Sequence, residues 1–264
     1  DPIQDVTIPG FTFRYNYLKG WALELSIRGN MVKTDVNEVI NPSGGRYVFF
    51  KYSYESNDFI TGFAFSPTGV DEVYRNYSYN QFLLEWEEYF RNPLFAQHAF
   101  SLRLRAGYID RPVDSFFHLF AGGILGMRGY SYFSIEGRQK LIASFSYRFP
   151  VFRHIDKMLG HLYLDKVYMG FFYDYGNAWN GSINMDDFKQ DVGLEIRVNM
   201  FSNSLFPTRV FFTAAYPIKK AYNRNVNVVY EQDMRFYFGM LFDFDLRERM
   251  GNLFTRTPRE LYRR

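Results

Sequence analysis

Residues 191–200 alternate between apolar and polar side chains without a break. Successive side chains of a β-strand leave opposite faces, so this stretch predicts a strand with one apolar and one charged face. The apolar set is Val192, Leu194, Ile196, Val198 and Met200, and the polar set is Asp191, Gly193, Glu195, Arg197 and Asn199. Residues 235–245 repeat the pattern, with Phe236, Phe238, Met240, Phe242 and Phe244 on one face. A soluble sandwich would bury the apolar face, whereas a transmembrane barrel turns it toward lipid and its charges toward a wet lumen.

The composition favours the barrel. Aromatic residues make up 21% of the chain and charged residues 22%, while the mean hydropathy is only −0.29. Aromatic girdles outside and charges inside a barrel would produce this combination. No uncharged apolar run approaches the roughly 18 residues of a transmembrane helix. We therefore predict an all-β fold, a closed antiparallel transmembrane β-barrel; a soluble all-β fold of one or two domains is the alternative.

Eleven stretches have strand character, and most have the length of a tilted membrane crossing. They are 11–17, 21–27, 47–55, 59–65, 81–91, 99–109, 138–149, 167–175, 191–200, 209–216 and 235–245. Bacterial single-chain barrels have even strand numbers, so a twelfth strand is expected within 31–40. A total of about 12 also follows from the usual lengths of strands and connections.

Turn residues predict three hairpins, at Lys19-Gly20, at Ser56-Asn57-Asp58 and at Asn92-Pro93. Residues 66–80, 110–137, 176–189 and 217–233 are expected to be long outer loops, and 151–166 a connection with a short helix. Antiparallel strands alternate in direction, so the turns near Asn57 and Asn92 cannot both lie opposite the long loops. At least one of these predicted turns or strands must therefore be misplaced.

The sequence gives no sign of an enzyme. Cysteine is absent, and His98, His118, His154 and His161 have no metal-ligand spacing. A nucleophile elbow and a phosphate-binding glycine loop are absent too, so we expect neither cofactor nor metal. Glu85 and Glu87 lie on the polar face of their strand, and lumen lining explains them better than acid–base catalysis. A net charge of +3 is too small to indicate nucleic-acid binding.

Three motifs occur in order in the second half of the chain. Met127-Arg128-Gly129-Tyr130 lies in the longest loop, Tyr147-Arg148-Phe149-Pro150 ends the next strand, and Phe172-Tyr173-Asp174-Tyr175-Gly176-Asn177 lies on the strand after it. Here the chain resembles the barrel of the bacterial surface-antigen superfamily, which includes outer-membrane barrel-assembly insertases and two-partner secretion transporters. The resemblance covers the last five strands, about half of the chain.

This resemblance implies that the tip Arg128-Gly129-Tyr130 folds back into the lumen and that Arg128 meets Asp174, in the aromatic-x-Asp-x-Gly pattern that ends at Gly176. Many relatives carry a glutamate as second partner on the intervening strand, where this chain has Ser146. We expect Ser146 to be an additional acceptor. The alternative is that Arg128 is an exposed loop cation and Asp174 one lumen charge among many.

The last strand resembles the C-terminal assembly signal of outer-membrane barrels through Tyr237, Gly239, Phe242 and Phe244. The alternative is an ordinary lipid-facing strand whose glycine relieves crowding. Relatives usually stop at the final aromatic residue, whereas this chain continues with six arginines between Arg247 and Arg264. We predict a barrel over residues 1–245 and a basic periplasmic tail over 246–264.

The resemblance implies a bacterial outer-membrane protein that assists insertion or translocation of polypeptides. The expected partners are outer-membrane lipid and other envelope proteins or a larger complex, with no nucleic acid. The alternative function is a barrel anchor or small-solute pore that fixes a periplasmic module to the membrane. Residues 177–180 (Asn-Ala-Trp-Asn) and 152–157 are most similar to the barrel ends of large envelope proteins with a periplasmic β-propeller, so a piece of a larger protein is expected.

Overall fold

The computed structural model describes residues 3–8, 11–33, 41–66, 69–95, 97–202, 206–223, 225 and 227–241. Within these ranges the fold is all-β, as the alternating sequence predicts, and its only helices are three short 3-10 turns. No helix in the described part is long and apolar enough to cross a membrane.

The chain order of the elements defines their labels. They are β1 (Ile3–Ile8), β2 (Phe11–Asn16), β3 (Leu18–Asn30), β4 (Gly45–Ser66), β5 (Gly69–Arg91), β6 (Ala99–Ile109), η1 (Ser115–Phe117), β7 (Leu119–Phe120), η2 (Tyr132–Ser134), β8 (Glu136–Gly137), β9 (Gln139–Phe152), β10 (Lys157–Leu159), β11 (Leu162–Trp179), η3 (Met185–Asp187), β12 (Lys189–Ser202), β13 (Phe206–Pro217), β14 (Ala221–Asn223), β15 (Val228–Tyr230) and β16 (Arg235–Leu241).

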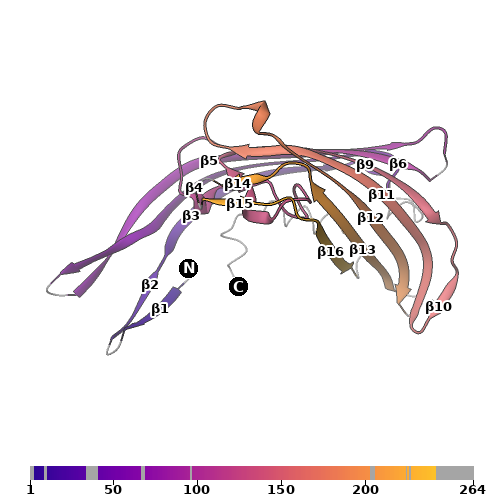
Figure 1. Ribbon diagram of the computed structural model, residues 1–264. Coiled ribbons are helices and arrows are strands. Elements are labelled where there is room, and N and C mark those ends of the chain that lie inside the picture. The colour runs from indigo at the N-terminus through magenta and orange to yellow at the C-terminus, as the bar shows by residue number, and fades with distance from the viewer. Residues whose placement is uncertain are drawn as a thin grey trace.

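One antiparallel sheet dominates the structure. Its strands follow the chain in the order β3, β4, β5, β6, β9, β11, β12, β13 and β16, and β10 adds a short pairing to β11. The sheet curves into an arch, with β14 and β15 beneath it (Figure 1). Among the described residues, β3 pairs only with β4 and β16 only with β13. The antiparallel all-β sheet is thus present, and its described part is open at both edges.

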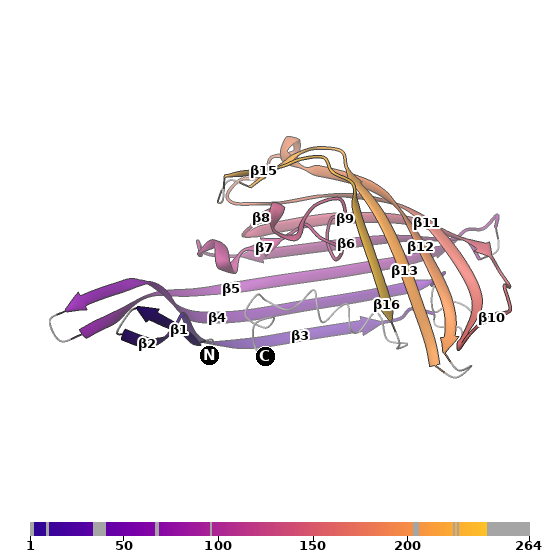
Figure 2. The ribbon, with the colours of Figure 1, turned by 60° about the horizontal axis from the view of Figure 1, so that its bottom comes forward.

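The two faces of the sheet follow the predicted alternation. The convex face carries exposed apolar side chains, including Leu194, Phe212, Phe236 and Phe238. The concave face carries buried side chains, among which charged groups are frequent. Figure 2 shows the same sheet from below, with β3 and β16 at its two margins. This polarity is the one that a barrel wall requires and the reverse of a soluble sandwich.

The first half of the sheet differs from the sequence prediction. The expected hairpin at Lys19-Gly20 is wrong, because both residues lie inside β3, which pairs with β4. The segment 11–17 instead contributes β2, which pairs with β1 outside the main sheet. The expected turn at Ser56-Asn57-Asp58 is also wrong, because β4 runs through it and pairs there with β5. Turn-forming residues were overridden at both places because ladder partners satisfy their backbone groups, on one side in β3 and on both sides in β4.

The remaining differences concern loops. Residues 69–80, expected in a loop, belong to β5, and the expected helix within 151–166 is replaced by β10 and the start of β11. The hairpin of β5 and β6 around Asn92-Pro93 is confirmed. Merging two expected strands into β4 removes the register conflict, since the connections after β4, β6, β11 and β13 then share one end of the sheet. The suspected twelfth strand, at 31–40, falls largely outside the described residues, and 31–33 are not in a strand.

Candidate functional site

The long connection between β6 and β9 packs against the concave face of the sheet. Its apolar residues Met127 and Tyr130 are buried in a cluster with Ile142 of β9 and Ala178 of β11. Two backbone hydrogen bonds, from Met127 to the Ala121 carbonyl (2.7 Å) and from Gly123 to the Tyr130 carbonyl (2.8 Å), fold the loop back on itself. The loop tip is therefore packed onto the sheet through apolar contacts of its own.

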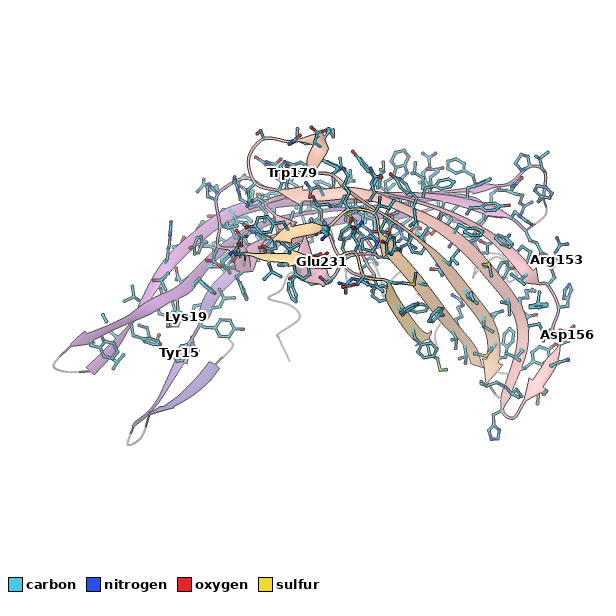
Figure 3. The ribbon with its side chains drawn as sticks, viewed as in Figure 1. Tyr15, Lys19, Arg153, Asp156, Trp179 and Glu231 are labelled. Carbon is cyan, nitrogen blue, oxygen red and sulfur yellow. The ribbon has the colours of Figure 1, made fainter. Side chains whose placement is uncertain are left out.

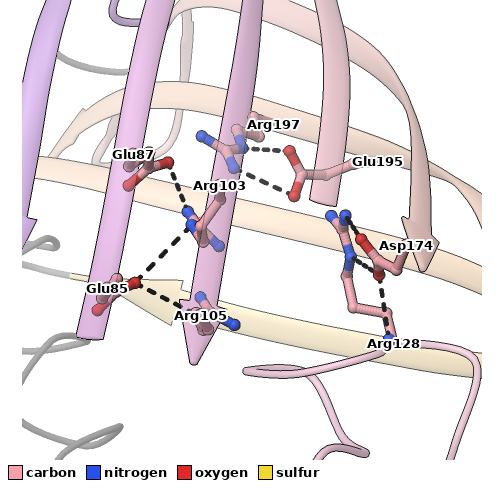
Figure 4. A network of polar contacts seen from close by, with 8 residues as sticks. All are labelled: Glu85, Glu87, Arg103, Arg105, Arg128, Asp174, Glu195 and Arg197. Carbon is pink, nitrogen blue, oxygen red and sulfur yellow. Dashed lines mark hydrogen bonds and ion pairs between the residues drawn. The ribbon is translucent and has the colours of Figure 1, made fainter. Parts of the chain in front are cut away.

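Arg128 at this tip meets Asp174 of β11. Its Nε donates to Asp174 Oδ2 at 2.9 Å and its Nη2 to Oδ1 at 2.8 Å, a bidentate pair. The backbone N–H of Arg128 also donates to Oδ2, at 3.2 Å. Asp174 is fully buried, so the guanidinium offsets a carboxylate charge that would otherwise be costly to bury. Figure 4 shows the Arg128 side chain extended from the loop to this carboxylate.

Two neighbours fix the shape of the tip. The guanidinium carbon of Arg128 lies 3.4 Å from the ring centre of Phe172, which is a cation–π contact. Phe172 lies on β11, the same strand as Asp174. A Cβ atom at Gly129 would stand 2.6 Å from the Cβ of Asp191 and 2.9 Å from the backbone nitrogen of Pro217. Glycine is therefore required here by the close approach of the loop to β12 and β13.

Hydrogen bonds from three sides hold the backbone of the tip. The Tyr130 hydroxyl lies 2.9 Å from the Gln190 carbonyl oxygen and 2.8 Å from that of Lys219, between which it shares its proton. Tyr237 donates from its hydroxyl to the Arg128 carbonyl (2.8 Å), and Arg235 Nε donates to the Gly129 carbonyl (3.1 Å). Burial raises the pKa of Tyr130 to about 12, so its hydroxyl remains a donor at neutral pH.

A second carboxylate stands beside the ion pair. Asp191 of β12 lies directly opposite Asp174 in the ladder, and it too is fully buried. Neither of its carboxylate oxygens has a hydrogen-bond partner within the described part of the chain. The tip thus brings one guanidinium to two neighbouring acids.

The other predicted loop-anchor residues are placed as follows. Gly176 lies in β11, where a Cβ would approach the Leu141 carbonyl oxygen to 2.6 Å. Ser146 lies on β9 opposite Phe172, whereas Ser144 is the residue across from Asp174. Both side-chain hydrogen bonds of Arg128 in the described structure go to Asp174, and Ser146 takes no part in this contact. The Phe172 ring, which faces the guanidinium, occupies the position next to Ser146 in the ladder.

The two described residues of the predicted assembly signal, Tyr237 and Gly239, both lie on the concave face of β16. Tyr237 points inward to the loop tip, and Gly239 leaves room for the ring of Phe211, which a Cβ would approach to 2.4 Å. Phe242 and Phe244 lie outside the described residues. The roles of Tyr237, Arg235, Phe172 and Asp191 at the tip were missed from the sequence. Face alternation does place all four on the concave face, but it cannot say which of them the loop reaches.

Further ion pairs line the concave face beside the loop. Arg103 of β6 pairs with Glu87 of β5 at 2.7 Å, and Arg105 Nε lies 3.2 Å from Glu85. On β12, Arg197 holds Glu195, with Nε 2.5 Å from Oε1. Figure 4 shows these pairs next to Arg128 and Asp174. Glu85 and Glu87 therefore line the concave face, as expected. The described residues contain no group of side chains that could hold a metal ion.

Comparison with known families agrees with this geometry. The family model described as the Omp85 superfamily domain matches residues 6–244 of the 264 in the chain. No curated protein sequence matches the chain. Members of the matched superfamily are outer-membrane proteins, of the group that inserts or translocates proteins. Because the match spans the sheet, its inward loop and the last described strand, the chain belongs to the Omp85 superfamily.

Proposed function

We propose that this protein is a bacterial outer-membrane barrel that assists the insertion or translocation of polypeptides. The observation that supports this role best is the loop tip bound to the concave face through Arg128 and Asp174. A loop held there would act as an internal strut, supporting the β11–β16 part of the wall while the opposite part moves. Its direct partners would be outer-membrane lipid and client polypeptides, within a larger envelope assembly.

The open edges support the same proposal. An edge strand in lipid has unpaired backbone groups, which only pairing with another strand can satisfy. β3 and β16 are the first and ninth strands of an antiparallel sheet, so they run in the same direction. Antiparallel closure at about twelve strands would need three strands beyond these nine. Our proposed working form is a barrel closed through such further strands, which opens at the edge of β3 or of β16 to pair with a client strand.

Photo-crosslinking tests this role. The photoreactive residue p-benzoylphenylalanine is placed on the outer face of the edge strands, at Leu25 of β3 or Phe238 of β16. The matched control carries it at Leu104, on the outer face of β6, which has neighbours on both sides. The protein is reconstituted in lipid vesicles and a urea-denatured eight-stranded outer-membrane barrel is added. We expect faster folding of that client than in empty vesicles, with crosslinks from the edges and few from Leu104.

Equal folding rates with and without the protein, and no edge crosslinks, would refute the proposed role. That result would favour the alternative function, a barrel anchor or small-solute pore for a periplasmic module. The exposed apolar convex face favours this alternative as much as the first, since any membrane anchor needs it. Passage of small solutes in the same vesicles would distinguish a pore from a plain anchor.

A further inference from the structure

A polar pocket lies at the end of the sheet that bears the long connections. It has a volume of about 510 Å³ and is enclosed by η2 and β8, by the end of β11 with η3, and by β14. Trp179, which lines the pocket, is labelled in Figure 3. It lies at the end of β11, and the labelled residues Arg153 and Asp156 lie at the opposite end of the sheet. The volume falls within the range of about 300–1,000 Å³ that small-molecule sites occupy. The Arg128 tip does not line this pocket.

Three side chains on one wall of the pocket have unused hydrogen-bonding groups. Asn177 is only 7% exposed, yet its amide makes no hydrogen bond within the described part of the chain. The Ser182 hydroxyl has no partner among the described residues either. Asn180 accepts a hydrogen bond from the backbone of Arg138 through its oxygen, and its NH₂ end has no acceptor there. Asn177 is the buried one of the three, while Asn180 and Ser182 are exposed. Their polar groups are therefore available to hydrogen-bond a ligand in the pocket.

The charged groups of the pocket, in contrast, already have partners. Lys189 donates to the Asp187 carbonyl at 2.9 Å, and the Asp187 carboxylate accepts from Asn184 at 3.4 Å. Glu136 accepts from Asn225 at 2.6 Å. The uncommitted groups are therefore neutral amides and a hydroxyl, which both donate and accept. They suit a neutral ligand rich in hydroxyl groups.

An exposed aromatic ring also lines the pocket. Tyr222 of β14 lines the pocket and is 52% exposed, while its hydroxyl is held by Asn227. Its ring is thus left as an apolar surface at the pocket wall, against which the C–H face of a sugar ring can pack. We propose that this pocket binds a neutral saccharide, with Asn177, Asn180 and Ser182 bonded to its hydroxyls and Tyr222 packed on its ring.

Tryptophan fluorescence tests the proposal. The chain has three tryptophans, so W21F and W86F together leave Trp179, at the pocket wall, as the only reporter. This protein, in a detergent without a sugar headgroup, is titrated with the methyl glycosides of glucose, galactose, mannose, rhamnose and N-acetylglucosamine. We expect saturable quenching or enhancement by at least one of them. Lipopolysaccharide added as a competitor distinguishes a surface glycan from a free sugar as the source.

Variants locate the binding site. N177A and, separately, the milder S182A should each weaken binding about tenfold, the equivalent of one or two lost hydrogen bonds. N76A, which removes an exposed amide on β5 outside the pocket, should leave affinity unchanged. Heat-dependent gel migration verifies that each variant is folded. Absence of a saturable response to all five sugars, equal affinity in S182A and wild type, or tighter binding of inorganic phosphate would each overturn the proposal.

Discussion

The β3–β5 part and the β9–β16 part of the sheet carry the same alternation but use it differently. β4 and β5 have 22 and 23 residues, about 73 Å at the usual rise per residue and far more than a bilayer core requires. Their ends, from Thr61 of β4 and up to Tyr79 of β5, pair only with each other in the ladder and form a two-stranded tip. β12 and β13 have 14 and 12 residues and pack their concave face against the loop. Alternation thus predicts a strand with two different faces. It does not distinguish a strand of the main sheet from one in the projecting two-stranded tip.

The two parts also differ in how deeply their ion pairs are buried. In the β9–β16 part, a loop tip is fixed by an ion pair whose carboxylate is fully buried. At the tip of the β3–β5 part, both side chains of the Lys19–Glu72 ion pair are partly exposed. We therefore expect the β9–β16 part to respond strongly to single substitutions, and the two-stranded tip of β4 and β5 to tolerate them.

The largest effect should come from breaking the loop anchor. R128A leaves Asp174 buried without its cation, so we expect a loss of about 3–5 kcal/mol in the free energy of unfolding. K19A is the matched control, and it should change stability little because solvent screens the exposed pair. Urea unfolding from lipid vesicles measures both. Similar losses in the two variants would contradict the contrast between the parts.

Charges placed at exposed apolar positions should separate the wall from the tip. Leu194 of β12 and Val73 of β5 are 44% and 42% exposed, so they differ in position rather than in exposure. L194R should cost about 2–4 kcal/mol if β12 crosses the lipid. V73R should cost little, since the tip extends beyond the wall. A small cost at Leu194, or a large one at Val73, would argue against this assignment of the membrane zone.

Shortening the tip should matter less still. Replacing residues 61–73 by Asn-Gly joins Ile60 to Tyr74, which are ladder partners, through a two-residue turn. The junction contact of Phe59 with Phe116, at 5.3 Å between ring centres, is kept. We expect stability within about 1 kcal/mol of wild type, because the contacts removed, such as those of Glu72 with Lys19 and of Phe63 with Tyr15, are only partly buried. Failure of the shortened protein to fold into vesicles would show that the tip is structural.

The smallest expected effect is a pH dependence at the turn between β5 and β6. His98 Nδ1 lies 2.6 Å from the Tyr147 hydroxyl of β9. Burial, helped by the charge of Arg153, lowers the pKa of His98 below its usual 6.5. The unfolded chain then binds the proton more readily, so stability should fall as pH drops through 6.5 toward the folded pKa. In H98Q this slope should flatten between pH 8 and 5; an unchanged slope would assign it to other groups.

The sequence was most informative where structure is local. The predicted segment 99–109 coincides with β6, 191–200 and 209–216 lie within β12 and β13, and 138–149 lies within β9 except for its first residue. The reason is that the period of two depends only on each strand and its two faces. The inward positions of Asp174 and Tyr237 follow from the same rule. The meeting of Arg128 with Asp174 was expected from the family resemblance, since no local property brings residues 46 positions apart into contact.

The tertiary structure decided what depends on distant partners. Gly20 and Asn57 read as turn residues, yet they lie opposite each other in the ladder of β3 and β4, because pairing outweighs a weak local turn preference. The contact of Tyr237 with the Arg128 carbonyl, the position of Asp191 beside Asp174 and the pocket at the end of β11 have the same origin. Each depends on how the loop between β6 and β9 folds onto strands that follow it, and packing between segments so far apart leaves no periodic signal in either one.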